Sequence, residues 1–421
     1  MPTNIGIMGL GTIGLGVYNI LKDKLKTLNE KHDLEINIRA VADLNVDSLN
    51  LKDTNTYKDA SEMLEKERLD IVVELIGGTG IAKELMIKAI KNKSNIVTAN
   101  KAIISEFGNE IFSLAKDNNI NISYEASVGG VNPIISTMQN YLSSNNITSI
   151  KGILNGTCNF ILTKMQQGLS YEKALKTAQE EGFAEADPTL DVNGADTAHK
   201  ITILSRLAFG IDVTFNDIHF EGIQKLKNMD FDFAKENNYK IKLLGIANKK
   251  DDSYDIRVHP VLIEENHPLA KVDDEFNAVF IEGDYSGPIM LAGKGAGRYP
   301  TATAVVHDVV QIARKIKHGI KDSCPILKKS NLLQIERTKN QGYIRILSVD
   351  KPGVLAQEAK VLGDNKINIM GFFQSLKYKH NSHIPDIITV SDTEFINIRA
   401  ALGQLKNLEC VAEDPFFLRI E

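Results

Sequence analysis

A short acidic segment followed by a lysine has the clearest capacity for chemistry. Residues 182–200 read GFAEADPTLDVNGADTAHK, in which Asp196 and Lys200 are four positions apart and therefore neighbours on one face of a helix. Reduction of a carbonyl requires an acid that protonates the oxygen as hydride arrives, and an ammonium can do this while stabilising the developing alkoxide. The carboxylate would help to keep the lysine charged. The alternative is an ordinary surface ion pair of little energetic weight.

The N-terminal segment carries the glycine pattern of a dinucleotide-binding turn. Gly9 permits a tight turn, Gly11 leaves room for a pyrophosphate, and Gly14 lets the following helix approach the strand. The apolar run 4–9 before the turn and the helical stretch after it strengthen this interpretation over a glycine-rich turn without cofactor. The predicted cofactor residues of the turn are Gly9, Gly11, Thr12, Ile13 and Gly14.

Asp43 ends the second predicted strand. A carboxylate there can accept hydrogen bonds from the adenosine ribose and would repel a 2'-phosphate. No arginine lies in segment 42–47, which favours NAD slightly over NADP. The alternative role for Asp43 is that of a turn or helix cap.

Two further segments could face the cofactor. Lys101 directly follows the fourth predicted strand, at the carboxyl edge where open α/β sheets bind ligands. It could polarise a carbonyl, or be a solvated lysine at a helix start. Gly295 and Gly297 belong to GKGAGRYP, which leads into a predicted helix at 302–318 and forms either a cofactor-facing loop or only a tight turn.

The segment EASVGGVNP, residues 125–133, places one carboxylate before a glycine-bearing loop. Oxygen ligands of this kind suit a hard monovalent or divalent ion, or the segment is a hinge between domains. Cys158 could act as a nucleophile, as in acylating aldehyde dehydrogenases, or be a small thiol packed in the core.

These residues are positioned by three predicted domains of an α/β protein. Apolar strands alternate with helices up to about residue 125, which predicts a Rossmann-type parallel sheet. The strand-rich stretch 239–283 predicts a mixed or antiparallel sheet, and the stretch from residue 343 reads βαββαβ. We therefore expect a dinucleotide-binding domain at 1–130 with 302–320, an α+β substrate and dimerisation domain at 131–301, and a ferredoxin-like domain at 342–421.

Composition excludes several classes of protein. The 421 residues are 43% hydrophobic and 24% charged with a net charge of -5, which argues against a nucleic-acid binder. Cys158, Cys324 and Cys410 are too few for a disulfide framework or zinc cluster and fit a reducing cytoplasm. No apolar run is long enough to span a membrane, and the N-terminus resembles no secretion signal.

The motifs together resemble the homoserine dehydrogenase family, in family order across the chain: GLGTIGLGV, TANKA, EASVGG, GILNGT, GFAEADPTLDVNGAD with AHK, and GKGAGRYPTATAVV. The resemblance implies NAD(P)H-dependent reduction of L-aspartate 4-semialdehyde to L-homoserine, in threonine, methionine and isoleucine biosynthesis. It implies that Lys200 is the acid in reduction and the base in oxidation, with Lys101 near the carbonyl. Glu185 would hold the substrate's ammonium, with Asp191 and Asp196 in the same pocket.

The resemblance also implies a sodium or potassium ion held at Glu125, Val128, Gly130 and Asn132, largely by backbone carbonyls. Family members usually read GGGIP where this chain has GGVNP, a departure that backbone ligation could tolerate. They usually carry threonine at the position of Cys158, which gives that sulfur no catalytic duty. The arginine that many members carry after the second strand is absent, so cofactor preference stays open between NAD and NADP.

The C-terminal βαββαβ unit resembles ACT domains, which are small regulatory modules that bind amino acids. Its DKPGVL stretch, 350–355, matches their first strand-to-helix turn, where Gly353 lets the backbone approach a zwitterionic ligand. This resemblance implies pairing between chains, as a homodimer or homotetramer, and threonine as an effector; the alternative is a pairing module that binds no ligand. The rival functions are an acylating semialdehyde dehydrogenase that uses Cys158 and a non-catalytic amino-acid sensor.

Overall fold

The computed structural model describes residues 2–49, 51, 54–322 and 327–421. Their contacts divide the chain into two compact units. The first comprises Met1–Gly156, Asp196–Ile218 and Phe276–Ser330, and the second comprises Thr157–Ala195, His219–Glu275 and Asn331–Glu421. Cys324 lies outside the described residues. None of the described helices has the length and apolar character that crossing a bilayer requires.

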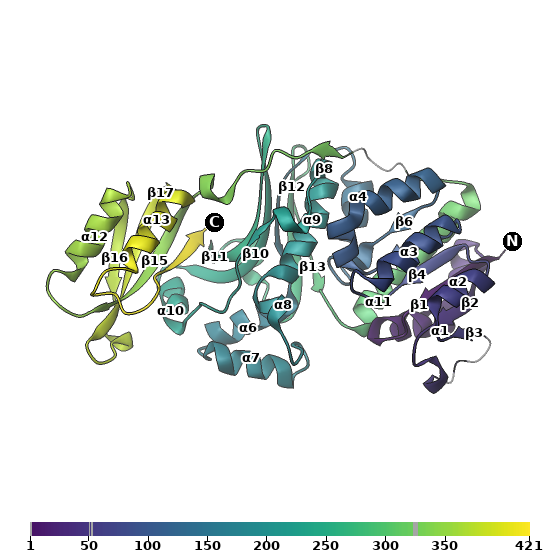
Figure 1. Cartoon of the computed structure of the whole chain (residues 1–421), viewed down its shortest axis with the longest axis horizontal. Helices are drawn as coiled ribbons and strands as arrows, with labels where there is room; N and C mark the ends of the chain where they lie inside the picture. Colours follow the sequence, from purple (N-terminus) through teal and green to yellow (C-terminus); the bar gives the residue numbers. More distant parts are fainter. Residues whose placement is uncertain (1, 50, 52–53, 323–326) are drawn as a thin grey trace. The chain divides into compact units, whose positions relative to one another are not determined.

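A six-stranded parallel sheet forms the N-terminal part of the first unit, with the order β3-β2-β1-β4-β5-β6 (Figure 1). Every neighbouring pair in it is parallel. The order runs outward from β1 in both directions, which is the doubly wound arrangement of dinucleotide-binding folds. The strands are β1 (Thr3–Met8), β2 (Ile36–Ala42), β3 (Asn55–Tyr57), β4 (Ile71–Glu74), β5 (Asn95–Thr98) and β6 (Ile122–Ser123).

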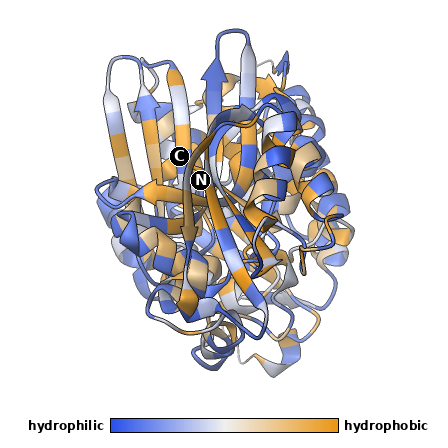
Figure 2. Ribbon diagram, turned by 90° about the vertical axis from the view of Figure 1, so that its left-hand side faces the viewer, coloured by the Kyte–Doolittle hydropathy of each residue, from blue (hydrophilic) through white to orange (hydrophobic). Residues whose placement is uncertain are grey.

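Helices cover both faces of this sheet. Ile5 and Ile7 of β1 pack in one hydrophobic layer with α1 (Thr12–His32) and α11 (Arg298–His318). Met8 packs in a second layer with the remaining helices, α2 (Ala60–Lys66), α3 (Ile81–Lys91) and α4 (Lys101–Asn118). Burial on both faces explains why the strands are continuous apolar runs. Across the chain, Figure 2 shows hydrophobic stretches in orange within strands and helices and mostly hydrophilic loops in blue. The predicted α/β class with a Rossmann-type parallel sheet is confirmed.

Three antiparallel strands extend the first unit: β7 (Ile147–Ile153), β12 (Phe276–Gly283) and β13 (Gly287–Lys294), in the order β7-β12-β13. Strand β13 was not predicted from the sequence. All residues of β13 are at least partly exposed, and the strand contains a proline and two glycines, as an edge strand tolerates. The pattern therefore lacks the buried apolar positions from which a strand is predicted.

Helix α9 (Ala195–Phe209) is more buried than its sequence indicates. The apolar spacing predicts an amphipathic helix, but from Ala195 to Arg206 every residue except His199 is buried. The polar residues on its remaining faces are buried too, and they include Asp196 and Lys200. Buried polar groups require partners, and Asp196 and Lys200 are partners of each other. Short elements complete the unit: η1 (Val46–Ser48), η2 (Glu125–Ser127), α5 (Ile134–Ser136), η3 (Thr137–Tyr141), η4 (Phe215–Asp217), and the parallel pair β8 (Ile211–Asp212) and β14 (Lys328–Lys329).

The second unit is built around a long antiparallel hairpin, β10 (Tyr239–Lys250) and β11 (Ser253–Glu264). The short strand β9 (His219–Phe220) pairs with β11. This strand-rich stretch confirms the predicted mixed sheet. The remaining elements before the C-terminal module are α6 (Gly156–Gln166), α7 (Tyr171–Glu180), α8 (Thr189–Val192), α10 (Asn228–Glu236), η5 (Pro268–Lys271) and η6 (Ile335–Arg337).

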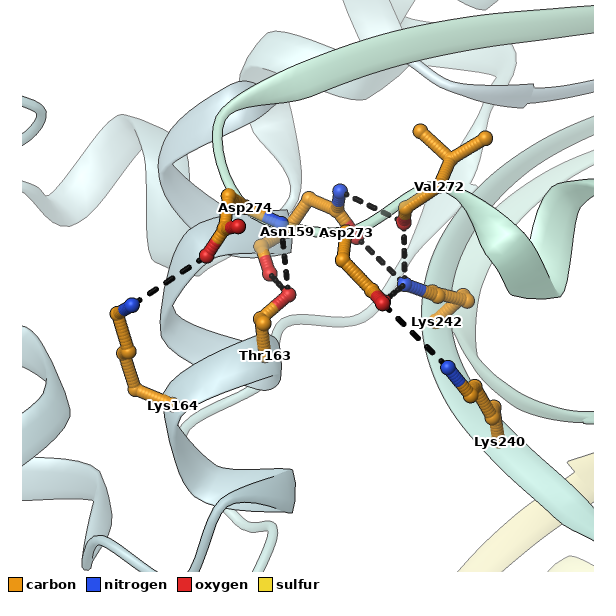
Figure 3. A network of polar contacts seen from close by, with 8 residues as sticks. All are labelled: Asn159, Thr163, Lys164, Lys240, Lys242, Val272, Asp273 and Asp274. Carbon is orange, nitrogen blue, oxygen red and sulfur yellow. Dashed lines mark hydrogen bonds and ion pairs between the residues drawn. The ribbon is translucent and has the colours of Figure 1, made fainter.

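A buried lysine ties α6 to this hairpin (Figure 3). The ammonium of Lys242, on β10, donates to Asn159 Oδ1 at 3.1 Å, to Asp273 Oδ1 at 3.0 Å and to the carbonyl of Val272. Burial lowers the pKa of Lys242 despite the Asp273 carboxylate. Because three acceptors use the three N–H bonds of the ammonium, we interpret Lys242 as a structural residue.

The C-terminal module has the predicted βαββαβ order and the sheet order β18-β15-β17-β16, with every pair antiparallel. This is the strand arrangement of a ferredoxin-like fold, and the prediction is confirmed. Its edge strand β18 also pairs in parallel with β11. The elements are β15 (Lys339–Val349), α12 (Val354–Asp364), β16 (Ile369–Gln374), η7 (Leu376–Tyr378), β17 (His383–Glu394), α13 (Phe395–Leu405) and β18 (Phe416–Ile420).

Two buried carboxyl groups meet inside this module. Glu358 of α12 is fully buried and accepts a hydrogen bond from Ser348 of β15. Asp386 of β17 accepts one from the Gln374 amide at 2.7 Å. Burial, together with the charge of Asp386, raises the pKa of Glu358 from its ordinary value of 4.5 to about 7. Glu358 therefore binds a proton in the folded module at pH values where the unfolded chain has released it.

We expect Glu358→Gln to change the pH dependence of stability. Between about pH 4.5 and pH 7 the wild-type free energy of unfolding should lose a contribution on the order of 3 kcal/mol as the pH rises, because the folded state holds the extra proton. The glutamine has no proton to lose. Urea midpoints followed by circular dichroism should therefore favour the variant more at pH 8 than at pH 5, and an equal difference at both values would contradict this assignment.

Candidate active site

The glycine turn at the end of β1 has the geometry that a dinucleotide requires. Gly9 has φ +92°, and a Cβ there would lie 2.7 Å from the Leu75 carbonyl oxygen. A Cβ on Gly14 would lie 2.0 Å from the Gly9 oxygen, whereas a Cβ on Gly11 would meet nothing within 4 Å. Only Gly11 therefore faces open space, next to the first turn of α1, which starts at Thr12 and continues through Ile13 without an acidic residue. A pyrophosphate fits this helix start.

Asp43 fastens the turn to the end of β2. Its Oδ2 accepts from the Leu10 amide at 2.7 Å, and its Oδ1 accepts from the Asn45 amide at 2.9 Å. The residue is thus a turn cap, which was the alternative to a ribose contact. The two roles are compatible, because each carboxylate oxygen has a second lone pair with which it can accept a hydroxyl.

Two lysines share one buried carboxylate in the first unit. Asp196 Oδ2 lies 2.7 Å from Lys200 Nζ, and Asp196 Oδ1 lies 3.1 Å from Lys101 Nζ. Burial raises the pKa of Asp196, but the ammonium groups of Lys200 and then Lys101 outweigh it and hold that pKa well below its ordinary value. The carboxylate is therefore ionised near neutrality. Asp196 and Lys200 are 7% and 9% exposed, which rules out the alternative of a surface ion pair.

Two asparagines and a carbonyl complete the surroundings of Lys200. Lys200 Nζ donates to the Leu154 carbonyl at 2.7 Å, and Asn277 of β12 donates to the same carbonyl at 3.0 Å. Asn155 donates to Asp196 Oδ2 at 2.9 Å. Neither asparagine was predicted to be a site residue. Asn155 follows strand β7 in the GILNGT motif, a signal that could have identified it, whereas nothing in the local sequence indicates Asn277.

The second glycine-rich loop lies beside these groups. A Cβ on Gly295 would be 2.0 Å from the Asn277 carboxamide, so any larger residue there would displace the Asn277 side chain. Gly297 has φ +114° and precedes α11. Gly130 touches the same loop, since a Cβ on it would lie 2.5 Å from Gly295. The loops that contain Gly130 and Gly295 therefore meet close to the Lys200 cluster.

The predicted ion loop uses its carboxylate within the protein. Glu125 accepts from the amides of Ile135 and Ser136, both at 2.8 Å. The amide and side chain of Asn132 both donate to the Gly129 carbonyl. Val128 and Gly130 are buried in the same loop and offer only backbone oxygens. The described residues contain no group of three or more His, Cys, Asp or Glu side chains that could hold a metal.

Glu185 and Asp191 lie in the second unit. Glu185 is exposed, in the loop before α8, and its carbonyl accepts from the Gln179 side chain at 3.2 Å. The Asp191 carbonyl accepts a hydrogen bond from the Cys158 thiol at 3.2 Å. Cys158 is fully buried, as expected of a core thiol rather than an accessible nucleophile.

A glycine turn on a doubly wound parallel sheet, with two lysines around one ionised carboxylate in the same unit, defines an NAD(P)-dependent oxidoreductase. The chain belongs to the homoserine dehydrogenase family. The family models "Homoserine dehydrogenase, NAD binding domain" and "Homoserine dehydrogenase" match residues 9–125 and 133–310. The predicted family and enzyme class are therefore confirmed.

Individual relatives support the same family assignment. A homoserine dehydrogenase from Neisseria gonorrhoeae is 40% identical, over all of this chain and 99% of the relative. The crystal structure of a homoserine dehydrogenase from Thiobacillus denitrificans covers all of this chain and 98% of its own, with 36% identity and a TM-score of 0.93. A hyperthermophilic archaeal homoserine dehydrogenase in complex with NADPH covers 75% of this chain and 98% of its own, with 27% identity and a TM-score of 0.65.

Proposed function

We propose that this protein reduces L-aspartate 4-semialdehyde to L-homoserine and that Lys200 supplies the proton. The observation that carries the proposal is the buried ammonium of Lys200, 2.7 Å from both Asp196 and the Leu154 carbonyl, in the unit that contains the glycine turn. These contacts use two of its three N–H bonds, which leaves one for a substrate carbonyl oxygen.

The chain's own residues account for the proton and charge in this step. A bound nicotinamide cofactor supplies the hydride. Lys200 donates a proton to the aldehyde oxygen as the oxygen becomes an alkoxide, and it recovers the proton from the alcohol in the reverse direction. Asp196 pairs with the ammonium of Lys200, and Lys101, whose side chain is 41% exposed, adds a second positive charge to stabilise the alkoxide.

We assign substrate recognition to Glu185 and Asp191, on the family resemblance of the segment 182–196. L-Aspartate 4-semialdehyde carries an ammonium, and a carboxylate is the group that binds it most strongly. The exposed position of Glu185 supports this role, because its side chain is available to a ligand.

We propose a slight preference for NAD over NADP. The Asp43 carboxylate at the end of β2 supports it, because a 2'-phosphate would be repelled there. Lys58 follows the neighbouring strand β3 and pairs with Asp47 at 2.6 Å, so a cation close to this edge would reduce that repulsion. The preference is therefore expected to be modest.

We further propose that the loop of Glu125, Val128, Gly130 and Asn132 holds a sodium or potassium ion. One carboxylate, already bonded to two amides, together with backbone carbonyls suits a weakly bound alkali ion better than a transition metal. Such an ion would stiffen the loop that touches Gly295.

The C-terminal module is proposed to bind threonine and to pair chains as a homodimer or homotetramer. At the start of α12, Gly353 has φ +89°, and free amides at a helix start can bind a carboxylate. Strand β16 is an edge strand with a row of exposed apolar side chains, which supports pairing with a second copy. These side chains are Ile369, Met370, Phe372 and Phe373.

A steady-state assay tests the function. Homoserine oxidation should proceed with NAD and with NADP, faster at limiting cofactor with NAD, and threonine should inhibit it. Absence of turnover with both cofactors would overturn the proposal.

Repeating the assay in tetramethylammonium chloride instead of potassium chloride tests the proposed alkali ion. Removal of the ion should also lower the thermal midpoint of the protein.

The same assay separates the rival functions. Cys158→Ser should retain activity, because a hydroxyl can donate to the Asp191 carbonyl as the thiol does. Phosphate-dependent oxidation that disappears in this variant would instead indicate an acylating dehydrogenase. Threonine binding without any cofactor turnover would indicate an amino-acid sensor.

A further inference from the structure

Helices α4 and α9 carry the two lysines of the site, and polar contacts at Asp196, His199 and Arg206 of α9 connect these helices. The middle contact joins His199 Nδ1 to Ser105 Oγ at 2.7 Å. It lies one helical turn from the lysine–carboxylate pair on both helices. In order along α9, the pairs are Asp196 with Lys101, His199 with Ser105 and with Glu106, and Arg206 with the Ile104 carbonyl.

The His199 ring is held firmly in place. It stacks on Phe215 of η4, with ring centroids 4.0 Å apart and planes 13° apart. Its side chain is only 14% exposed. A hydrogen bond on one edge and a stacked ring on one face leave the imidazole a single favourable orientation.

The ring is uncharged at neutral pH. Burial, and after it the positive charge of Lys101, lowers the pKa of His199 to about 4. Lys200 acts in the same direction and Asp196 opposes it, while Glu106 Oε1 lies 4.0 Å from Nε2. Either neutral tautomer can bond to Ser105, because a hydroxyl both donates and accepts. His199 thus connects the helices without adding a third cation around Asp196.

We propose that His199 is a positioning residue, which through Ser105 holds α4 against α9 so that Lys101 and Lys200 share the Asp196 carboxylate. The inference rests on the proposed function, because it concerns the rate of the step in which Lys200 gives up its proton. Reacting groups must be placed to within a fraction of an ångström, and a displacement of about 1 Å can cost on the order of 100-fold in rate.

The test compares variants of the full chain in homoserine oxidation. Ser105→Ala and His199→Phe remove the bond, and phenylalanine keeps the stacked ring. Each should lower kcat roughly 10-fold and leave the KM for the cofactor unchanged, since the glycine turn is untouched. The double variant should lose no more than either single one, because both remove the same bond. His199→Asn, whose carboxamide can still reach Ser105, should recover most of the rate.

Ser205→Ala is the matched control. Ser205 is buried on α9 and donates to the Ile201 carbonyl within the same helix at 2.7 Å, so its loss removes a buried bond without separating the helices. Its kcat should match the wild type. Wild-type kcat in Ser105→Ala, multiplicative losses in the double variant, or an equal loss in Ser205→Ala would overturn the inference. Failure of the wild type itself to turn over would overturn the proposed function and this inference with it.

Discussion

Lys200→Ala is expected to lower kcat for homoserine oxidation by roughly 1,000-fold, within the range that a general acid or base contributes. The variant loses the proposed proton donor, the Lys200 ammonium, which is held by hydrogen bonds to Asp196 and to the Leu154 carbonyl. The affinity for NAD(P)H should persist, because the glycine turn and Asp43 are unchanged. Turnover and cofactor fluorescence titration measure the two effects separately.

Lys164→Ala serves as the matched control for this experiment. Lys164 pairs with Asp274 at 3.3 Å in the second unit and is none of the proposed catalytic or binding residues, so its replacement should leave kcat unaltered. A Lys200→Ala protein that folds, binds cofactor and turns over within about threefold of the wild type would refute the role of Lys200.

Gly11→Ala is expected to weaken NAD(P)H binding on the order of 100-fold. The new methyl group meets no protein atom within 4 Å, so it would occupy the open space at the start of α1. The methyl group would remove one or two charge-assisted hydrogen bonds between the pyrophosphate and the helix amides. Their loss costs about 3 kcal/mol of binding free energy, which corresponds to this change in affinity. The thermal midpoint of the cofactor-free protein should not fall.

Gly363→Ala is the control for the added methyl group. Gly363 lies in α12 of the C-terminal module, where a Cβ likewise meets nothing within 4 Å. It should bind cofactor as the wild type does. Unchanged affinity in Gly11→Ala would mean that the pyrophosphate does not approach this turn.

The parts of the fold that local patterns specify were predictable from the sequence. The glycine turn needs only Gly9, Gly11 and Gly14 in the right order after an apolar strand. The C-terminal βαββαβ order follows from alternating periodicities of two and 3.6 residues. The spacing of Asp196 and Lys200 likewise places them on one helical face.

The contacts that complete the site were not predictable, because they join residues distant in the chain. The sequence predicts that Lys101 lies at the ligand-binding edge of the sheet, but its contact with Asp196 follows only from the packing of α4 against α9. Asn277 reaches the Leu154 carbonyl from β12 across the antiparallel strands. The hydrophobic periodicity of α9 predicts an amphipathic helix, but polar side chains on its other faces, such as Lys200 and Ser205, form hydrogen bonds within the protein and are buried.

The parallel pairing of β18 with β11 limits how this gene could be shortened or recombined. Val261 and Leu262 align with Arg419 and Ile420, and the Glu421 amide donates to the Leu262 carbonyl at 2.9 Å. A chain that stopped before the ferredoxin-like module would lack β18, so this edge of β11 would be unpaired. Unpaired strand edges can pair with other chains and cause aggregation. Removing the module should therefore make the protein prone to aggregate, and a shorter version would need another segment that pairs with the edge of β11.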